Sequence, residues 1–287
     1  MNTIAILITS YNRKEKTIYC LKNLFNSTNQ QLDYTIKVYL VDDGSIDGTA
    51  SAIKMEFPEV IIIQGTGNLF WAGGMRLAWH TAKDIGEYNY FLLLNDDTVL
   101  LPDIITDLIH SNKKCKTALI KEGITVGTTI DSESGKISYG GSLLRNKFSP
   151  KSDKVYKENE DMPCDLGNAN IMLVPKEIVD EIGILSTIFT HGLADFDYTL
   201  RAKKSGYWVM VAPFICGYCK NDHGKRWKSS NIKLTDRINF LYSPKGLAYK
   251  EYMYFIKTHF PLSYPVLFVK LWTKTFFPFI YDRFKTE

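Results

Sequence analysis

One amide and two carboxylates, Asn95, Asp96 and Asp97, directly follow the apolar run 91–94. Four apolar residues between polar ones predict a short strand that is buried on both faces, as in a parallel sheet. Ligands of open α/β sheets bind at the carboxyl edge of the strands, where carboxylates can hold a divalent metal ion and the phosphates that it carries. A plain turn is the competing interpretation, because Asn and Asp are common turn residues.

A second acidic pair, Asp42 and Asp43, ends another predicted strand at 34–41. The glycines and short polar side chains of 44–49 predict a turn and a cap for a helix at 50–57. Two adjacent carboxylates are more than such a turn needs, so the pair also predicts hydrogen bonds to a base or a ribose. A role in the turn and cap alone is the alternative.

The third acidic group, Asp195 and Asp197, lies at the predicted start of a helix. A helix dipole stabilises carboxylates there by about 0.3–1 kcal/mol. Asp197 is also four residues before Arg201, which is the spacing of a helical ion pair. These structural roles explain Asp197 well. They explain Asp195 less well, since a cap needs one carboxylate and the preceding turn at 191–192 predicts an approach to a cavity.

Alternating strands and helices position these groups over the first 115 residues, which predicts a parallel sheet with covered faces. Gly73 and Gly74 lie at the expected start of one helix, where they would let the backbone approach a phosphate or sugar. The polar stretch 131–163 predicts a mobile loop and hairpin region. The expected strands are 3–10, 34–41, 60–63, 91–94 and 170–175, and the expected helices are 14–26, 50–57, 75–85, 102–110 and 176–182.

The composition, with 287 residues of which 45% are hydrophobic, fits a globular protein of one large or two modest domains. Five cysteines without framework spacing, and no charged and apolar export signal, predict a reducing cytoplasm. Cys216 and Cys219 form a Cys-x-x-Cys pair, but no second Cys/His pair lies at zinc-finger spacing. We therefore expect ordinary buried thiols.

The last part of the chain, 220–287, is basic and aromatic, with 13 Lys and Arg against 5 Asp and Glu and with 16 of the 38 aromatic residues. Cations and rings together favour an anionic membrane surface. The aromatics cluster, as in 276–281, instead of being spaced for base stacking, so we expect no nucleic-acid partner. Lysines and prolines interrupt 249–284, which therefore lacks a membrane-spanning run. We expect it to lie on the inner face of the cell membrane, or to pack on the catalytic domain or a second subunit of a homodimer.

Four motifs follow one another along the chain. They are Thr-Ser-Tyr-Asn at 9–12, Val-Asp-Asp-Gly-Ser with Asp-Gly-Thr at 41–49, Asn-Asp-Asp at 95–97, and Ala-Asp-Phe-Asp-Tyr at 194–198 with Arg201 and Gly206-Tyr207. In this order they resemble family 2 of the inverting glycosyltransferases. Further motifs, Gly140-Gly141, 168–175 and 243–246, resemble its rhamnosyltransferase-like bacterial branch. The resemblance covers 3–246; each motif alone is weak, but four in register are specific.

This resemblance implies the GT-A fold, an α/β fold with a mostly parallel central sheet flanked by helices. The catalytic domain would be 1–219, with a nucleotide-sugar half at 1–115 and an acceptor half at 116–219, and 220–287 would be a helical extension. It also implies a nucleotide-sugar donor and a divalent metal, Mg²⁺ or Mn²⁺. The implied donor-binding residues are Thr9, Tyr11, Asn12, Arg13, Asp42, Asp43, Asn68, Gly74, Asn95 and Asp96, the metal ligands are Asp97 and His223, and the catalytic base is Asp195.

Two positions depart from the family pattern: Asn95 replaces the first acid of its metal motif, and Ala194 replaces the Glu before Asp195. The expected reaction is inverting transfer of a sugar, from dTDP-rhamnose or a UDP-sugar, to a glycan or lipid-linked acceptor in cell-surface polysaccharide synthesis. Because of these two replacements, the alternative is a catalytically degenerate module that binds a sugar nucleotide or a glycan. Nucleotidyl transfer is disfavoured, because the turn 9–13 lacks the glycines of a phosphate loop.

Overall fold

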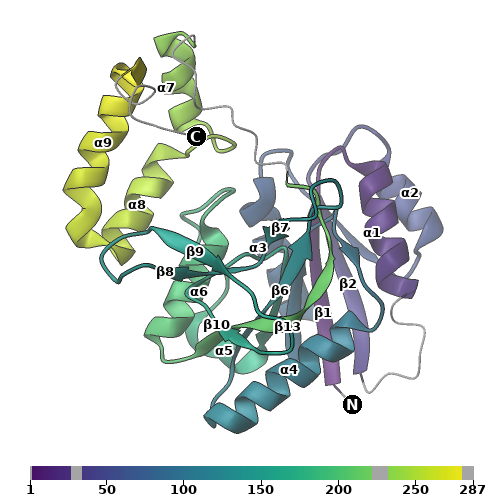
Figure 1. Cartoon of the computed structure of the whole chain (residues 1–287). Helices are drawn as coiled ribbons and strands as arrows, with labels where there is room; N and C mark the ends of the chain where they lie inside the picture. Colours follow the sequence, from purple (N-terminus) through teal and green to yellow (C-terminus); the bar gives the residue numbers. More distant parts are fainter. Residues whose placement is uncertain (1, 27–33, 222–231, 280–287) are drawn as a thin grey trace.

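A computed structural model describes residues 2–26, 34–221 and 232–279 (Figure 1). Its strands are β1 (Asn2–Ser10), β2 (Tyr34–Asp42), β3 (Ile61–Gln64), β4 (Tyr90–Leu94), β5 (Val99–Leu100), β6 (Gly123–Ile130), β7 (Ile137–Tyr139), β8 (Gly141–Leu144), β9 (Ser152–Val155), β10 (Met162–Pro163), β11 (Leu166–Gly167), β12 (Ile171–Pro175) and β13 (Trp208–Tyr218). A ten-stranded sheet of described residues has the order β10-β13-β6-β12-β4-β1-β2-β3, with β5 and β7 beside β13 and β6.

Most of the central pairs are parallel, as the sequence predicted. Strands β3, β2, β1 and β4 run parallel, and so do β6 and β13, while β12 runs antiparallel between β4 and β6. Ser10 pairs with Asp42, and Leu94 pairs with Ile171, the first residue of the reversed strand. The carboxyl ends of β1, β2 and β4 and the amino end of β12 therefore share one edge, which collects the acidic residues.

Helices cover both faces of this sheet, and residues of β1 alternate between two cores. The helices are α1 (Lys14–Asn26), α2 (Thr49–Glu56), α3 (Phe70–Ile85), α4 (Ile104–Leu119), α5 (Lys176–Ile182), α6 (Ala194–Lys204), α7 (Leu234–Tyr242), α8 (Tyr249–His259) and α9 (Tyr264–Phe276), with a 3₁₀ turn at Pro261–Ser263. In β1, Ala5 and Leu7 join the core formed with α3, α5, α6 and α8. Ile4, Ile6 and Ile8 join the core formed with α1, α2 and α4.

Two helices differ from the predicted bounds. Helix α3 begins at Phe70, not near 75, so Gly73 and Gly74 lie inside it and not at its start. Helix α4 continues to Leu119, well past the predicted end at 110, because Asn112 and Cys115 continue its buried face. The cysteines among the described residues are all buried and free, as expected.

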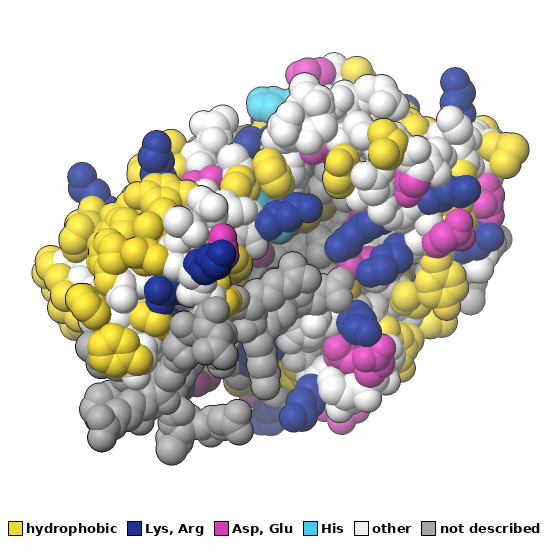
Figure 2. Space-filling model, turned by 90° about the horizontal axis from the view of Figure 1, so that it is seen from above, with side chains coloured by type: hydrophobic (Ala, Val, Ile, Leu, Met, Phe, Trp, Pro, Cys, Tyr) yellow, Lys and Arg dark blue, Asp and Glu magenta, His cyan; other side chains and the backbone are white. Residues whose placement is uncertain are grey.

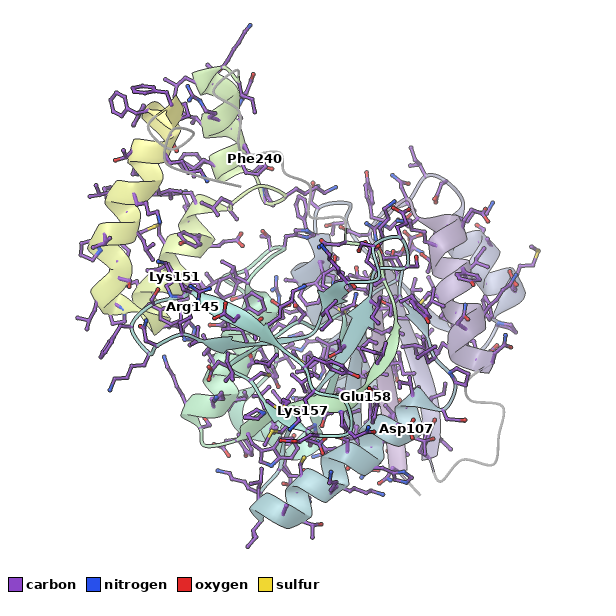
Figure 3. All side chains as sticks on the ribbon, viewed as in Figure 1. Asp107, Arg145, Lys151, Lys157, Glu158 and Phe240 are labelled. Carbon is purple, nitrogen blue, oxygen red and sulfur yellow. The ribbon has the colours of Figure 1, made fainter. Side chains whose placement is uncertain are left out.

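The stretch 131–163, predicted to be a mobile loop with hairpins, contains four short strands. β7 pairs with β6, β10 with β13, and β8 with β9 and β11 in a small second sheet. Figure 3 shows Arg145 and Lys151 at the end of this small sheet nearest the C-terminal helices. There the hydroxyl of Ser263 donates to the carbonyl of Phe148. The hairpin is thus attached to the C-terminal extension.

The C-terminal extension is helical, as predicted, and α8 and α9 lie along one side of the molecule (Figure 1). Phe255 and Ile256 of α8 enter the core of the main body. The 3₁₀ turn before α9 leaves Leu262 exposed, and α9 itself leaves Val266 and Val269 exposed. In the described part of the chain, no helix has the length and apolar character needed to cross a membrane.

Candidate functional site

The carboxylate of Asp43 organises the loop between β3 and α3. Its Oδ1 accepts the N–H of Gly67 (2.8 Å), and its Oδ2 accepts the N–H groups of Leu69 (2.8 Å) and Phe70 (3.1 Å). Asp43 itself is buried. A carboxylate with three backbone donors fixes the loop rigidly. Asn68 is exposed on this loop, so Asp43 determines where Asn68 lies.

The turn after β1 docks on the turn after β2. Asn12 accepts the N–H of Ile46 through Oδ1 (2.8 Å), and its own N–H donates to Ser45 Oγ (2.8 Å). Asp42 Oδ1 accepts the N–H of Ser45 (2.9 Å). Asn12 has φ 51°, in the left-handed region where Asn is enriched. Asn12 and Asp42, two of the predicted nucleoside-binding residues, thus both bond to Ser45 of the turn after β2.

Thr9 and Gly74 meet where α3 crosses β1. A Cβ at Gly74 would lie 2.0 Å from Thr9 Oγ1. Glycine at this position therefore allows close packing of helix and strand, which the sequence did not indicate. Contact of Gly74 with a donor stays a prediction.

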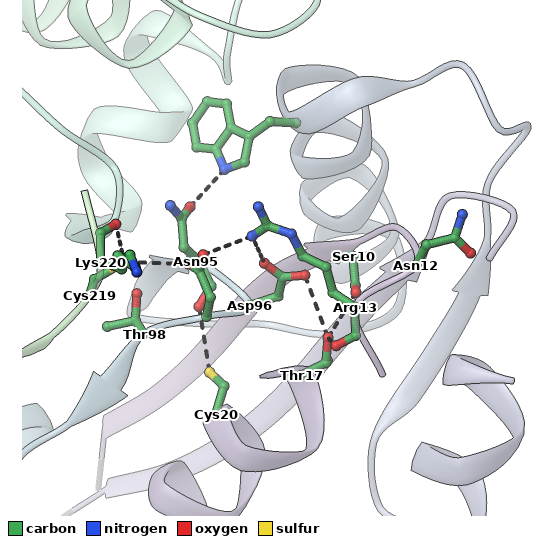
Figure 4. A network of polar contacts seen from close by, with 12 residues as sticks. Ser10, Asn12, Arg13, Thr17, Cys20, Asn95, Asp96, Thr98, Cys219 and Lys220 are labelled. Atoms are coloured by element: carbon green, nitrogen blue, oxygen red, sulfur yellow. Dashed lines mark hydrogen bonds and ion pairs between the residues drawn. The ribbon is translucent and has the colours of Figure 1, made fainter. Parts of the chain in front are cut away.

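Arg13 bridges the two carboxylates that follow β4 (Figure 4). Its Nη1 donates to Asp96 Oδ1 (3.1 Å) and to Asp97 Oδ2 (2.8 Å). Burial raises the pKa of Asp96 to about 6, the Arg13 guanidinium opposes this shift, and Asp97 adds to it. One guanidinium between two carboxylates leaves a net negative charge at the sheet edge, which favours a further cation.

Asn95, the first residue of the same turn, bonds to α3 through its side chain. Its Oδ1 accepts the indole N–H of Trp71 (2.9 Å), and its backbone N–H donates to the carbonyl of Asn170 (3.1 Å). The amide that replaces the family's acid therefore holds Trp71 of α3 over the turn. A contact of Asn95 with ribose or water was predicted, and this bond to Trp71 was not.

Cys219, at the end of β13, lies against Asp97. Its Sγ donates to Asp97 Oδ1 (3.4 Å) and accepts from Asn170 Nδ2 (3.3 Å). Burial, and then the charge of Asp97, raise the pKa of Cys219 to about 12, so the thiol stays protonated. Sequence reasoning treated Cys219 as an ordinary buried thiol; its neighbour Asp97 is 122 residues away in the chain, and no local signal pointed to the contact.

Asp195 lies in the first turn of α6, partly buried beside the start of β12. Its Oδ2 accepts the N–H of Ala169 (3.2 Å) and the amide of Asn168 (3.4 Å), and its Oδ1 accepts the N–H of Phe196 (2.9 Å). Burial raises its pKa above the ordinary value, although these hydrogen bonds act in the opposite direction. A carboxylate held in place with a raised pKa suits a general base.

A short chain of contacts joins Asp195 to Asp97. Asp195 contacts 168–169, the neighbouring Asn170 contacts Cys219, and Cys219 contacts Asp97. Thr98 supports the same link by donating its hydroxyl to Asn170 Oδ1 (3.1 Å). The structure thus brings the first and third acidic groups to adjoining parts of one edge.

The extension also reaches the turn after β1. Lys245 Nζ lies 5.9 Å from the ring centroid of Tyr11, a side chain that is 47% exposed. Lys245 belongs to the motif at 243–246, to which sequence reasoning gave no role. This contact places a cation beside the predicted nucleoside-binding residues.

The edge suits a divalent metal ion by its chemistry, because adjacent carboxylates supply hard oxygen ligands. Asp97 is the more exposed of the two, with 12% of its side chain accessible. No group of three or more His, Cys, Asp or Glu in the described ranges could hold a metal by itself. Mg²⁺ is commonly held by one or two carboxylates and by substrate phosphates, so the two carboxylates at this edge suit it. The predicted ligand His223 lies outside the described residues.

Comparison with known proteins agrees with this fold. The family model described as glycosyl transferase family 2 matches residues 5–148, just over half of the chain, and the chain belongs to this family. A search of curated proteins gave no match.

Two solved structures share the fold at low sequence identity. One is the mannosyltransferase PcManGT from Pyrobaculum calidifontis in complex with GDP-Man and Mn²⁺, with 15% identity, a TM-score of 0.53, and 78% of this chain and 57% of that one covered. The other is S. aureus TarS, with 13% identity, a TM-score of 0.51, and coverage of 77% and 60%. This chain therefore spans less than two thirds of either structure.

Proposed function

We propose that this protein is an inverting glycosyltransferase that moves a sugar from a nucleotide-diphosphate donor to a hydroxyl of an acceptor. The observation that carries the proposal is the meeting of Asp97 and Asp195 at one sheet edge through Asn170 and Cys219. In this proposal Asp97 lies beside the leaving diphosphate. Asp195 acts as the base, and burial raises its pKa above the ordinary value.

Asp195 accepts the proton of the acceptor hydroxyl as that oxygen attacks the anomeric carbon. The attack comes from the face opposite the diphosphate, so the configuration inverts. The N–H groups of Ala169 and Phe196 hold the carboxylate in place. A positioned base contributes about 10²–10⁴-fold to the rate.

Asp97, with Asp96 behind it, would hold Mg²⁺ or Mn²⁺ at the same edge. When bound, the metal neutralises charge that develops on the leaving diphosphate, as a Lewis acid. Arg13 already neutralises part of the carboxylate pair and adds positive charge beside the phosphates. The Mn²⁺ and GDP-Man named for PcManGT agree with such a site.

The donor's nucleoside end would lie on the joined turns after β1 and β2, with Thr9, Tyr11, Asn12, Asp42 and Asp43. Asn68, Gly74, Asn95 and Asp96 would lie nearer the diphosphate and sugar. Within this proposal the donor is dTDP-rhamnose or a UDP-sugar, in keeping with the rhamnosyltransferase-like motifs. A donor screen against UDP-glucose, GDP-mannose and dTDP-rhamnose distinguishes these.

The acceptor is a glycan or lipid-linked molecule of cell-surface polysaccharide synthesis, reached by a cytoplasmic enzyme at the inner face of the membrane. The 3₁₀ turn at Pro261–Ser263 and the following helix α9 support this part of the proposal. Leu262, Val266 and Val269 are 72%, 67% and 60% exposed, and hydrophobic side chains gather over this end of the molecule (Figure 2). Exposed Lys257 and Lys270 add positive charge that suits anionic lipid.

Liposome sedimentation tests the surface. Wild-type protein should bind vesicles that contain phosphatidylglycerol at low salt, and the double variant Val266→Ser, Val269→Ser should bind several-fold more weakly. Met55→Ser, which changes an exposed apolar residue of α2, is the control. Absence of wild-type binding contradicts the membrane role. If the wild-type protein is a dimer and the double variant is a monomer, the exposed face contacts a second subunit.

A degenerate binding module is the second candidate, because Asn95 and Ala194 depart from the family pattern. Both replacements have structural reasons here. Asn95 accepts from Trp71. Ala194, the first residue of α6, is fully buried in the core, where a glutamate would be costly. The departures therefore do not weaken the enzymatic proposal.

Calorimetry and an assay for released nucleoside diphosphate test the proposal together. Wild-type protein should bind one of the three donors more tightly with Mn²⁺ than with EDTA, and it should release nucleoside diphosphate. Asp97→Ala should lose the effect of Mn²⁺ on binding. Binding without metal-dependent release would favour the module.

A further inference from the structure

Helix α8 of the C-terminal extension packs on the segment that carries Asp195. Its two ends each make a polar contact there: Glu251 in the first turn, and His259 as the last residue. Between them, Phe255 packs against Phe189, with ring centroids 6.5 Å apart. The extension thus contacts both sides of the predicted base.

Glu251 holds the chain five residues before Asp195. Its Oε2 accepts the N–H of Thr190 (3.0 Å), and its Oε1 accepts the Thr190 hydroxyl (2.6 Å). The carbonyl of Thr190 accepts the N–H of Ala72 in α3 (3.0 Å). Thr190 is therefore held by α8 on one side and by α3 on the other.

Helix α3 makes a second attachment to the same segment. Arg76 Nη1 donates to the carbonyls of Ser186 (2.8 Å) and Phe189 (2.7 Å). The segment 186–190 has no regular secondary structure of its own, so these side chains supply the order that a helix or strand would otherwise give.

His259 holds the chain two residues after Asp195. Its Nε2 lies 2.8 Å from Asp197 Oδ1, and the two side chains are only 2% and 3% exposed. Asp197 Oδ2 accepts from Arg201 Nε (2.9 Å). Arg201 donates in turn to the carbonyls of Ile182 and Ile184, both at 2.8 Å. The first turn of α6 is thus fixed by a buried network that α8 completes.

These contacts bear on catalysis because a general base must stay within hydrogen-bond reach of the proton it accepts. Of the direct bonds to Asp195, those from Asn168 and Ala169 are long, at 3.4 and 3.2 Å, and the shortest, at 2.9 Å, comes from Phe196 in the same turn of α6. The position of the carboxylate therefore depends on the backbone of 190–197, and a displacement of about 1 Å can lower a rate about 10²-fold.

We propose that Glu251 and His259 are positioning residues for the glycosyl transfer, and that α8 is part of the catalytic apparatus. The inference rests on the proposed function, in which Asp195 is the base. In this view α9 faces outward, whereas α8 sets the position of the base, Asp195.

Kinetics of full-length variants test this role. Glu251→Ala and His259→Ala should lower kcat for nucleoside diphosphate release by about 10–100-fold. Donor binding is measured with Mn²⁺ and whichever of UDP-glucose, GDP-mannose and dTDP-rhamnose the protein uses. Its Kd should change less than about two-fold, because the turns proposed to bind the donor follow β1 and β2 and lie outside α8. His259→Gln, which keeps an N–H donor near the position of Nε2, should recover part of kcat. Lys250→Ala, an exposed change in the same helix, is the control.

An unchanged kcat in both alanine variants would overturn the inference, and so would equal losses in kcat and donor affinity. Hydrogen exchange of 186–200 provides a readout without any donor. Exchange there should rise in Glu251→Ala and not in Lys250→Ala. An unchanged rate in Glu251→Ala would also overturn the inference, even if His259→Ala fails to fold. Failure of wild-type protein to turn over any donor would instead refute the proposed function.

Discussion

The strongest stability prediction concerns Asp43, the buried carboxylate that fixes the loop before α3. Its three backbone donors are Gly67, Leu69 and Phe70, at 2.8, 2.8 and 3.1 Å. In Asp43→Ala all three N–H groups lose their acceptor. In Asp43→Asn one carbonyl oxygen remains, and the new NH₂ group faces donors in place of the second oxygen.

A hydrogen bond to a charged group contributes about 1.5–3 kcal/mol, and neighbouring bonds to one carboxylate are not additive. We therefore expect Asp43→Ala to lower the free energy of unfolding by about 3–4 kcal/mol and Asp43→Asn by about 2–3 kcal/mol. Urea unfolding monitored by circular dichroism measures both. The same variants should weaken nucleoside diphosphate binding, because the loop carries Asn68.

Asp84→Asn is the control, because Asp84 is exposed near the end of α3. Its effect should stay within about 0.5 kcal/mol. A loss below about 1 kcal/mol in Asp43→Ala would refute the reasoning, since water or a rearranged loop would then satisfy the three donors equally well.

Two further predictions concern packing and pH. Gly74→Ala places a Cβ 2.0 Å from Thr9 Oγ1 and should destabilise the fold by about 1–3 kcal/mol in urea, whereas Gly192→Ala, with no atom within 4 Å, should be nearly neutral. Burial raises the pKa of Asp195. We therefore expect kcat to fall as the pH decreases, with a midpoint above the ordinary aspartate pKa of about 3.9. A midpoint at or below that value would contradict the role of Asp195, which must be ionised to act.

The sequence predicted those elements whose signals are local. β1, α1, β4 and α5 follow from apolar runs, helical spacing and turn residues, and their observed bounds agree closely with the predicted ones. The reversed β12 was not predicted, since an apolar run carries no direction. The early start of α3 was not predicted because Gly73 and Gly74 disfavour a helix. The close approach of α3 to Thr9 explains Gly74.

The acidic groups of the site were predicted from their places at strand and helix ends, and the sheet brings them to one edge. Their partners were not predictable. Cys219 beside Asp97, Trp71 on Asn95 and His259 on Asp197 are contacts between residues 122, 24 and 62 positions apart. Such pairs depend on the tertiary fold and leave no local pattern.

The most direct test of the central claim is Asp195→Asn, measured for both donor binding and transfer. The exchange removes the proton-accepting oxygen while keeping the size of the side chain. We predict that the Kd of the donor stays within about two-fold and that transfer falls by about 10²–10⁴-fold. Transfer at a near wild-type rate would contradict the account.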